Sequence, residues 1–167
     1  GLSREQMEAF FLSIGEKKFR ASQVMKWIHH RGVTDFAKMT DLGKTLRGKL
    51  DEIAEVALPE IVEQHDSQDG TRKWFISVGE GSAVEAVLIP EGQRTTLCVS
   101  SQVGCSLDCK FCATAKIKRM RNLNADEIYD QVVAMDKQSR LYFDRPLSNI
   151  VFMGMGEPLL NIDDLLL

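Results

Sequence analysis

The spacing of apolar residues changes near Pro59, and this change divides the chain into two differently built parts. Before it, apolar residues recur every three or four positions, as they do on one face of a helix. After it, apolar and polar residues alternate, as they do in half-buried strands. The sequence therefore predicts an α/β protein whose first domain is helical.

Three short helices are expected in the first part. The first begins at Ser3, which stands three residues before Gln6 in a capping-box arrangement. The second runs from Ala21 to His30. The third carries an apolar stripe that is typical of packing in a core, formed by Leu42, Leu46, Leu50 and Ile53. We interpret residues 1–58 as a small helical accessory domain.

The second part reads as strands that pass into a β/α alternation. Glycine-containing turns separate the expected strands at 73–78 and 83–89, so residues 59–94 form a strand-rich connecting region. From residue 95 the chain alternates between strand, loop, helix and strand, with the regular elements expected at 95–100, 125–138 and 149–153. Residues 95–167 therefore begin a repeating β/α fold.

Three cysteines, Cys105, Cys109 and Cys112, stand close together on a loop that follows an expected strand. A structural zinc site or a ferredoxin-type cluster takes four protein ligands. The other cysteine, Cys98, lies in the preceding strand, and the three histidines are distant in sequence. Three ligands leave a metal position open, which lets a metal centre act on a substrate. A zinc site completed by a distant residue and a disulfide pair are the alternatives.

A second element of interest follows the last expected strand. The chain runs from Met153 into Gly154, Met155, Gly156 and Glu157. The two glycines allow close backbone approach. Glu157 stands at the carboxyl end of a strand, where β/α barrels place their chemistry. Taken alone, this Gly-Glu-Pro sequence is also compatible with an ordinary turn.

The cysteine spacing, with Phe111 just before the last cysteine, resembles the signature of the radical S-adenosylmethionine superfamily. Gly156 and Glu157 look like its Gly-Gly-Glu-type motif, with Met155 in place of the first glycine. The resemblance implies a partial β/α barrel, of which this chain holds the first part. It also implies that the three cysteines hold a 4Fe-4S cluster and that the open iron binds S-adenosylmethionine. Phe111 would lie near the adenine of this cofactor, and Gly156 and Glu157 would hold its amino group.

Longer segments resemble the dual-specificity RNA methyltransferases that methylate adenine carbon 2. The segments that carry this resemblance are Lys18–Ala21, Gly32–Phe36, Met39–Leu42, Cys98–Cys105, Lys110–Thr114 and Met153–Asn161. The resemblance implies two substrates, an adenosine of 23S rRNA and an adenosine in the tRNA anticodon loop. It also implies an electron-donating protein that reduces the cluster.

Two further residues gain a role from this resemblance. The family's proposed proton acceptor falls at Glu85, and a cysteine at the position of Cys98 helps to release the methylated RNA from a covalent link. The alternation alone puts Glu85 on one face with Val87 and Ile89, where an unpaired carboxylate would lose hydration and become a stronger base. An exposed edge position is the alternative for Glu85. Without the resemblance, Cys98 is a buried cysteine that acts as a small hydrophobe.

In this family the covalent link joins the RNA to a methylated cysteine in the C-terminal region of the enzyme. No residue of this chain replaces that cysteine. We therefore expect a fragment that does not turn over alone, and we expect the complete enzyme to be a monomer. No stretch approaches the roughly 18 consecutive apolar residues that span a bilayer, so we expect a cytoplasmic protein that binds no membrane.

The charge distribution fits an RNA partner without requiring one. Residues 1–50 are rich in Lys and Arg, and residues 110–121 are basic again. Such basic stretches either bind the phosphate backbone of a nucleic acid or simply form a solvent-exposed surface. Two other functions stay open. One is an adenine carbon-8 rRNA methyltransferase of the same superfamily, and the other is a noncatalytic zinc or iron-sulfur RNA-binding module.

Overall fold

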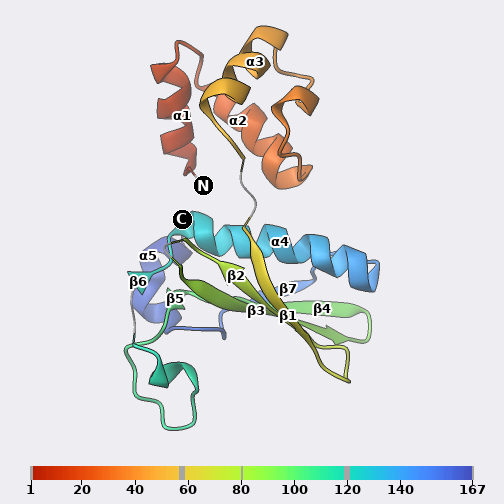
Figure 1. The fold of residues 1–167 in the computed structure, drawn as a ribbon, viewed down its shortest axis with the longest axis vertical. Helices are drawn as coiled ribbons and strands as arrows, with labels where there is room; N and C mark the ends of the chain where they lie inside the picture. Colours follow the sequence, from red (N-terminus) through yellow and green to blue (C-terminus); the bar gives the residue numbers. More distant parts are fainter. Residues whose placement is uncertain (1, 57–58, 80, 119–120, 167) are drawn as a thin grey trace. The chain divides into compact units, whose positions relative to one another are not determined.

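The computed structural model describes residues 2–56, 59–79, 81–118 and 121–166. The chain divides into two compact units, Gly1–Leu58 and Pro59–Leu167, which are described separately here (Figure 1). In the described residues, no helix has both the length and the apolar composition that crossing a bilayer requires.

The first unit is helical, with α1 at Arg4–Ser13, α2 at Phe19–Met25 and α3 at Lys44–Ile53. Ser3 caps α1 as expected, because its hydroxyl accepts the Gln6 N–H at 3.2 Å and the Gln6 side chain accepts the Ser3 N–H at 2.9 Å. Eight residues form the core of the unit: Phe11, Ala21, Val24, Phe36, Met39, Leu42, Leu46 and Leu50.

One expectation for this unit is confirmed and one is wrong. The expected second helix extends to His30, with α2 followed by a π-helical turn at Lys26–His30. Ile53 was expected in the core stripe, but its side chain is 48% exposed. It is the last residue of α3, so the buried face of this helix ends one turn earlier, at Leu50.

The second unit contains a five-stranded sheet in the order β1-β2-β3-β4-β7. Its strands are β1 at Ile61–Asp66, β2 at Arg72–Ser77, β3 at Ala83–Glu91, β4 at Arg94–Cys98 and β7 at Asn149–Val151. The first four strands pair antiparallel, whereas β4 and β7 pair parallel. The region expected to connect the domains therefore contributes β1, β2 and all of β3 to the same sheet that contains β4.

A single β/α crossover joins β4 to β7 within the described residues, and it runs through α4 at Ala125–Phe143. Figure 1 shows α4 lying along the sheet. Asn124 and Glu127 form a capping box at its start. A short two-stranded sheet joins β5, at Gln102–Val103, to β6, at Arg121–Asn122, and the chain ends in α5 at Ile162–Leu165.

The two faces of the main sheet have different environments. Alternate residues of β3, namely Val84, Ala86 and Leu88, are buried. Ala86 and Leu88 pack in one cluster with Met135 of α4. Glu85 and Val87 face the opposite side and are partly exposed. The predicted alternation of this strand is confirmed, but the face expected to be buried is wrong, because Glu85, Val87 and Ile89 lie on the more exposed face.

The strand β1 was not predicted from the sequence. All six of its residues, Ile61–Asp66, are exposed, and it is held by pairing with β2. An exposed edge strand has no apolar alternation, so burial patterns do not reveal it.

A pair of variants tests where the helical core ends. We expect Leu50→Ala to lower the free energy of unfolding of the helical unit by about 2–5 kcal/mol, because it leaves a cavity in a packed core. We expect Ile53→Ala to cost less than about 1 kcal/mol, because the side chain is half exposed. Hydrogen exchange of the α1 and α3 amides, measured by mass spectrometry, reports both values. Equal losses in the two variants would contradict the assigned core.

Candidate functional site

The three loop cysteines lie between β5 and β6. Cys105, Cys109 and Cys112 are free thiols and partly exposed. Local hydrogen bonds shape the loop, since Cys112 N–H donates to the Cys109 carbonyl at 3.0 Å and Cys105 N–H donates to the Ile117 carbonyl at 3.3 Å. The Leu107 N–H also points at the Cys105 sulfur, at 3.4 Å. The backbone therefore brings the three thiols onto one short loop.

The electrostatics of this loop favour a thiolate at its last cysteine. Backbone hydrogen bonds from Ala115, and then from Thr114, lower the pKa of Cys112 from its ordinary value. These donors belong to a 3-10 turn at Thr114–Lys116 that begins directly after the cysteine loop. Because a thiolate is the form that binds metal, this turn favours metal ligation at Cys112.

The donor set fits an iron-sulfur cluster by its chemistry, since it offers three unpaired thiols on an accessible loop. Within the residues that the structure describes, no group of three or more His, Cys, Asp or Glu side chains is placed to hold a single metal ion. The thiolates of a four-iron cluster bind different irons, so their sulfur atoms need not converge on one point. Phe111, beside Cys112, is 94% exposed.

The loop that follows β7 packs tightly against the chain that follows β4. Gly154 N–H donates to the Val99 carbonyl at 3.0 Å. A Cβ atom at Gly154 would lie 2.7 Å from both the Ser100 hydroxyl and the Val99 carbonyl oxygen. Gly156 has a φ of +99°, and a Cβ there would lie 2.6 Å from Cβ of Gln102. Both glycines are therefore required by close approach, and Gly156 also by its backbone conformation.

Glu157 is held at two points. Its backbone N–H donates to Oε1 of Gln102 at 3.0 Å. Its carboxylate accepts the Leu159 N–H at 3.1 Å and so caps the 3-10 turn at Pro158–Asn161. The carboxylate therefore has a fixed place at the carboxyl end of β7.

Glu85 does not stand unpaired, as the alternation had suggested. Lys73 on β2 lies 3.3 Å from its carboxylate, and both side chains are more than a third exposed. An exposed pair of this kind is screened by water, so it fixes the position of the carboxylate more than it stabilises the fold. The expected desolvation is wrong for Glu85 because its face of β3 is partly exposed, and the carboxylate is not isolated because β2 supplies a cation beside it.

Cys98 is buried at the end of β4, directly opposite Val87. The pKa of its thiol is raised, first because burial disfavours the thiolate and further because of the charge of Glu85; a backbone hydrogen bond with Met153 opposes the rise. The sheet therefore brings Glu85 and Cys98 into electrostatic contact, although their predicted roles came from separate strands.

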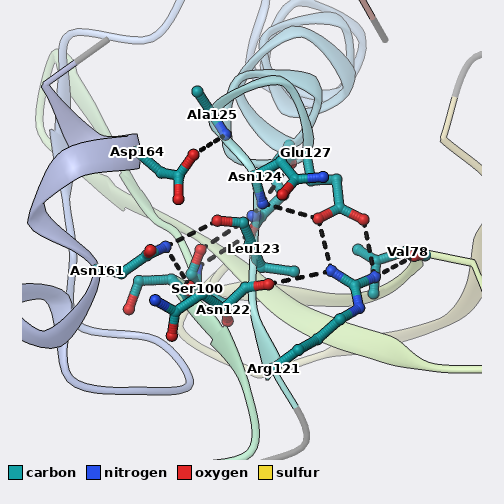
Figure 2. A network of polar contacts seen from close by, with 12 residues as sticks. Val78, Ser100, Arg121, Asn122, Leu123, Asn124, Ala125, Glu127, Asn161 and Asp164 are labelled. Atoms are coloured by element: carbon teal, nitrogen blue, oxygen red, sulfur yellow. Dashed lines mark hydrogen bonds and ion pairs between the residues drawn. The ribbon is translucent and has the colours of Figure 1, made fainter.

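Several buried polar residues were missed by the sequence reasoning. Ser100, Gln102, Gln131 and Asn161 are all at most 3% exposed. Figure 2 shows part of their network, in which the Asn161 amide donates to the Ser101 carbonyl at 2.9 Å and the Leu123 carbonyl at 2.8 Å. The one available signal was the polar run Ser-Ser-Gln placed directly after a buried strand.

The basic stretch near the cysteines is partly engaged within the fold. Arg121 forms two hydrogen bonds with Glu127, at 2.7 and 2.8 Å, and a third with the Val78 carbonyl (Figure 2). Lys110 pairs with Asp108 on the surface. Arg119, also part of this stretch, lies outside the described residues. Arg121 therefore braces the start of α4, and the phosphate contact predicted for the stretch stays a prediction.

Comparison with known proteins gives matches at both ends of the chain. Residues 1–56 match the family described as ribosomal RNA large subunit methyltransferase N-terminal domain, and residues 99–167 match the radical SAM superfamily. The structure is similar to that of a radical SAM methyltransferase from Sphaerobacter thermophilus, with a TM-score of 0.85 and 37% identity over 99% of this chain and 48% of that chain. The fold and the cysteine loop thus define a radical SAM protein.

Two curated relatives indicate which kind of radical SAM protein this chain resembles. The dual-specificity RNA methyltransferase RlmN of Saccharophagus degradans is 58% identical over 98% of this chain and 42% of its own length. The protein of the same name from Pseudomonas putida is 56% identical over 99% of this chain and 44% of its own length. The chain belongs to the family of these dual-specificity RNA methyltransferases, and it spans less than half the length of these relatives.

The close packing at Gly156 can be tested against a glycine with the same backbone requirement. Gly79 also has a positive φ, of +81°, but an added Cβ there would meet nothing within 4 Å. We expect Gly156→Ala to cost about 1–3 kcal/mol more than Gly79→Ala, because overpacking adds to the backbone strain. Urea unfolding of both variants measures the difference, and equal costs would rule out the tight packing against Gln102.

The effect of Glu85 on Cys98 predicts a change in thiol reactivity. In Glu85→Gln the negative charge is lost, so the pKa of Cys98 should fall and its thiolate should form at lower pH. At a fixed pH near 8 we expect iodoacetamide to modify Cys98 roughly two- to fivefold faster, because the thiolate is the reacting form. Peptide mass spectrometry over a pH series measures this rate. Glu91→Gln, on the same strand but exposed, serves as the control, and an equal change in both variants would count against the coupling.

Proposed function

We propose that this chain is the amino-terminal part of a radical S-adenosylmethionine RNA methyltransferase. In this proposal the complete enzyme methylates carbon 2 of an adenosine in 23S rRNA and of an adenosine in the tRNA anticodon loop. The observation that carries the proposal is the presence, in one chain, of a three-thiol loop and a Gly-Glu loop together with both family matches. The similarity to proteins named dual-specificity RNA methyltransferases supports the choice of RNA as substrate.

The roles of the site residues follow from their chemistry. Cys105, Cys109 and Cys112 hold a 4Fe-4S cluster. When bound, the cluster supplies the electron that cleaves S-adenosylmethionine and starts radical chemistry. This chemistry is needed because adenine carbon 2 is electron-poor and does not attack an ordinary methyl donor.

The cofactor itself has two proposed contacts on this chain. Phe111, with its exposed ring, offers a surface for the adenine. Gly156 and Glu157 hold the amino group, for which a fixed carboxylate is a suitable charged acceptor.

Glu85 and Cys98 act on the RNA in this proposal. Glu85 accepts a proton from the adenine, and Cys98 then helps to release the product from its covalent link to the C-terminal region. Proton uptake neutralises Glu85, and the charge that raises the pKa of Cys98 is then lost. Protonation of Glu85 therefore removes one of the two causes that raise the pKa of Cys98, whereas burial continues to raise it.

The location, the oligomeric state, the electron donor and the RNA-contacting unit of the enzyme belong to the same proposal. We expect a cytoplasmic monomer that receives electrons from a separate protein. The basic helical unit, residues 1–58, is the part that we expect to contact RNA, because clustered Lys and Arg neutralise phosphates.

Product analysis with the complete protein tests this function. The protein, reconstituted anaerobically with iron and sulfide and supplied with a reductant, is expected to form 2-methyladenosine in 23S rRNA fragments and tRNA, detected by mass spectrometry of nucleosides. Cys109→Ala should lose bound iron and all product, whereas Cys98→Ala should keep its iron. Formation of 8-methyladenosine would overturn the proposed position of methylation. Stoichiometric zinc without iron uptake would favour an RNA-binding module instead.

A further inference from the structure

The segment that follows β4 is polar and yet buried. Ser100 and Gln102 are 0% exposed, and Ser101 is 2% exposed. Burying polar side chains is costly unless they are hydrogen-bonded. The side chains of Ser100 and Gln102 each accept one N–H from the same loop, residues 154–157, which carries the proposed amino-group contacts.

Gln102 forms the first of these links. Its Oε1 accepts the Glu157 N–H at 3.0 Å, and its Nε2 donates to Oδ1 of Asn122 at 2.8 Å. The Asn122 amide in turn donates to the Leu160 carbonyl at 3.1 Å. A backbone N–H stands at one end of this chain of bonds and a backbone carbonyl at the other, so the orientation of both amides is determined.

Ser100 forms the second link. Its hydroxyl accepts the Met155 N–H at 2.8 Å and donates to the Glu85 carbonyl at 2.7 Å. Its own backbone is fixed by Gln131, whose amide bonds both the N–H and the carbonyl of Ser100 at 3.0 Å. The hydroxyl therefore joins the loop after β7 to the strand that carries Glu85.

These bonds decide what the loop offers to a ligand. Glycine-rich loops commonly present their N–H groups to anions. Here the N–H groups of Gly154, Met155 and Glu157 are all turned toward the segment after β4. With these donors engaged, the carboxylate of Glu157 is the dominant charged group of the loop. Such a loop suits a cationic amine better than a phosphate.

We propose that Ser100 and Gln102 are positioning residues that hold the loop of residues 154–157 with the N–H groups of Met155 and Glu157 turned inward, so that Glu157 presents its carboxylate to the amino group of S-adenosylmethionine. This inference rests on the proposed function. It assigns no direct contact with the cofactor to either residue. Its consequence is that both residues determine the affinity for the amino-acid portion of the cofactor and not for its adenosine.

The test uses the complete, cluster-loaded protein and two ligands. S-adenosylmethionine carries the amino group, whereas 5′-methylthioadenosine retains the adenosine and lacks the amino-acid portion. We expect Gln102→Met and Ser100→Ala to raise the Kd for S-adenosylmethionine roughly tenfold, as is typical when the support of a binding group is removed. The Kd for 5′-methylthioadenosine and the iron content should stay unchanged. Equilibrium dialysis measures both dissociation constants.

Ser139→Ala is the matched control. Ser139 is also 0% exposed and its hydroxyl also donates to a backbone carbonyl, that of Arg145, at 2.8 Å. It should lower the unfolding temperature about as much as Ser100→Ala without changing either Kd. Should Gln102→Met not fold, Asn122→Ala replaces it, because Asn122 is only partly buried and orients the Gln102 amide.

The outcomes separate this inference from the function on which it rests. A wild-type Kd for S-adenosylmethionine in Ser100→Ala together with Gln102→Met, or with Asn122→Ala in its place, overturns the positioning role. Equal weakening of both ligands also overturns it, since the effect would then be a general loss of structure. A wild-type protein that binds neither ligand overturns the proposed function itself.

Discussion

The hydrogen bonds between the segment after β4 and the loop after β7 are the interaction on which the candidate site depends. Parallel pairing ends at Cys98 and Val151, and beyond it the two chain segments stay together through Val99, Ser100 and Gln102. Two glycines permit the contact, because a Cβ at either would overlap its neighbours. The tight packing thus gives Glu157 a defined position at the edge of the sheet.

The two faces of the same sheet differ in burial and in charge. One face buries Trp74, Leu88 and Leu97 against α4 and forms the core. The other face carries Glu85 and Cys98, which are close enough for the carboxylate charge to raise the pKa of the thiol. Because strand residues alternate between faces, one set of strands both builds the core and carries the two residues proposed to act on the RNA. The charge coupling between Glu85 and Cys98 follows directly from the register of β3 and β4.

Much of the secondary structure was predictable because burial leaves a periodic signal. The strands β2 and β3 and the beginning of α4 were found this way. The capping box at Ser3 was found instead from its residue types and their spacing. Where burial gave no signal, prediction failed. β1 is exposed along its length, and Ile53 follows the helical spacing but lies at the exposed end of α3. The ion pair of Glu85 was missed because Lys73 comes from another strand.

The sequence by itself determined which residues are candidates for the donor set, since the spacing of three cysteines and the Gly-Glu pair are local features of the chain. Family membership rests on the same local features together with the matches at both ends. Only the tertiary structure decided what surrounds these groups. Ser100, Gln102 and Gln131 gained their roles because a crossover through α4 brings distant segments into contact. Hydrogen bonds between such segments depend on strand order and register, which no local pattern encodes.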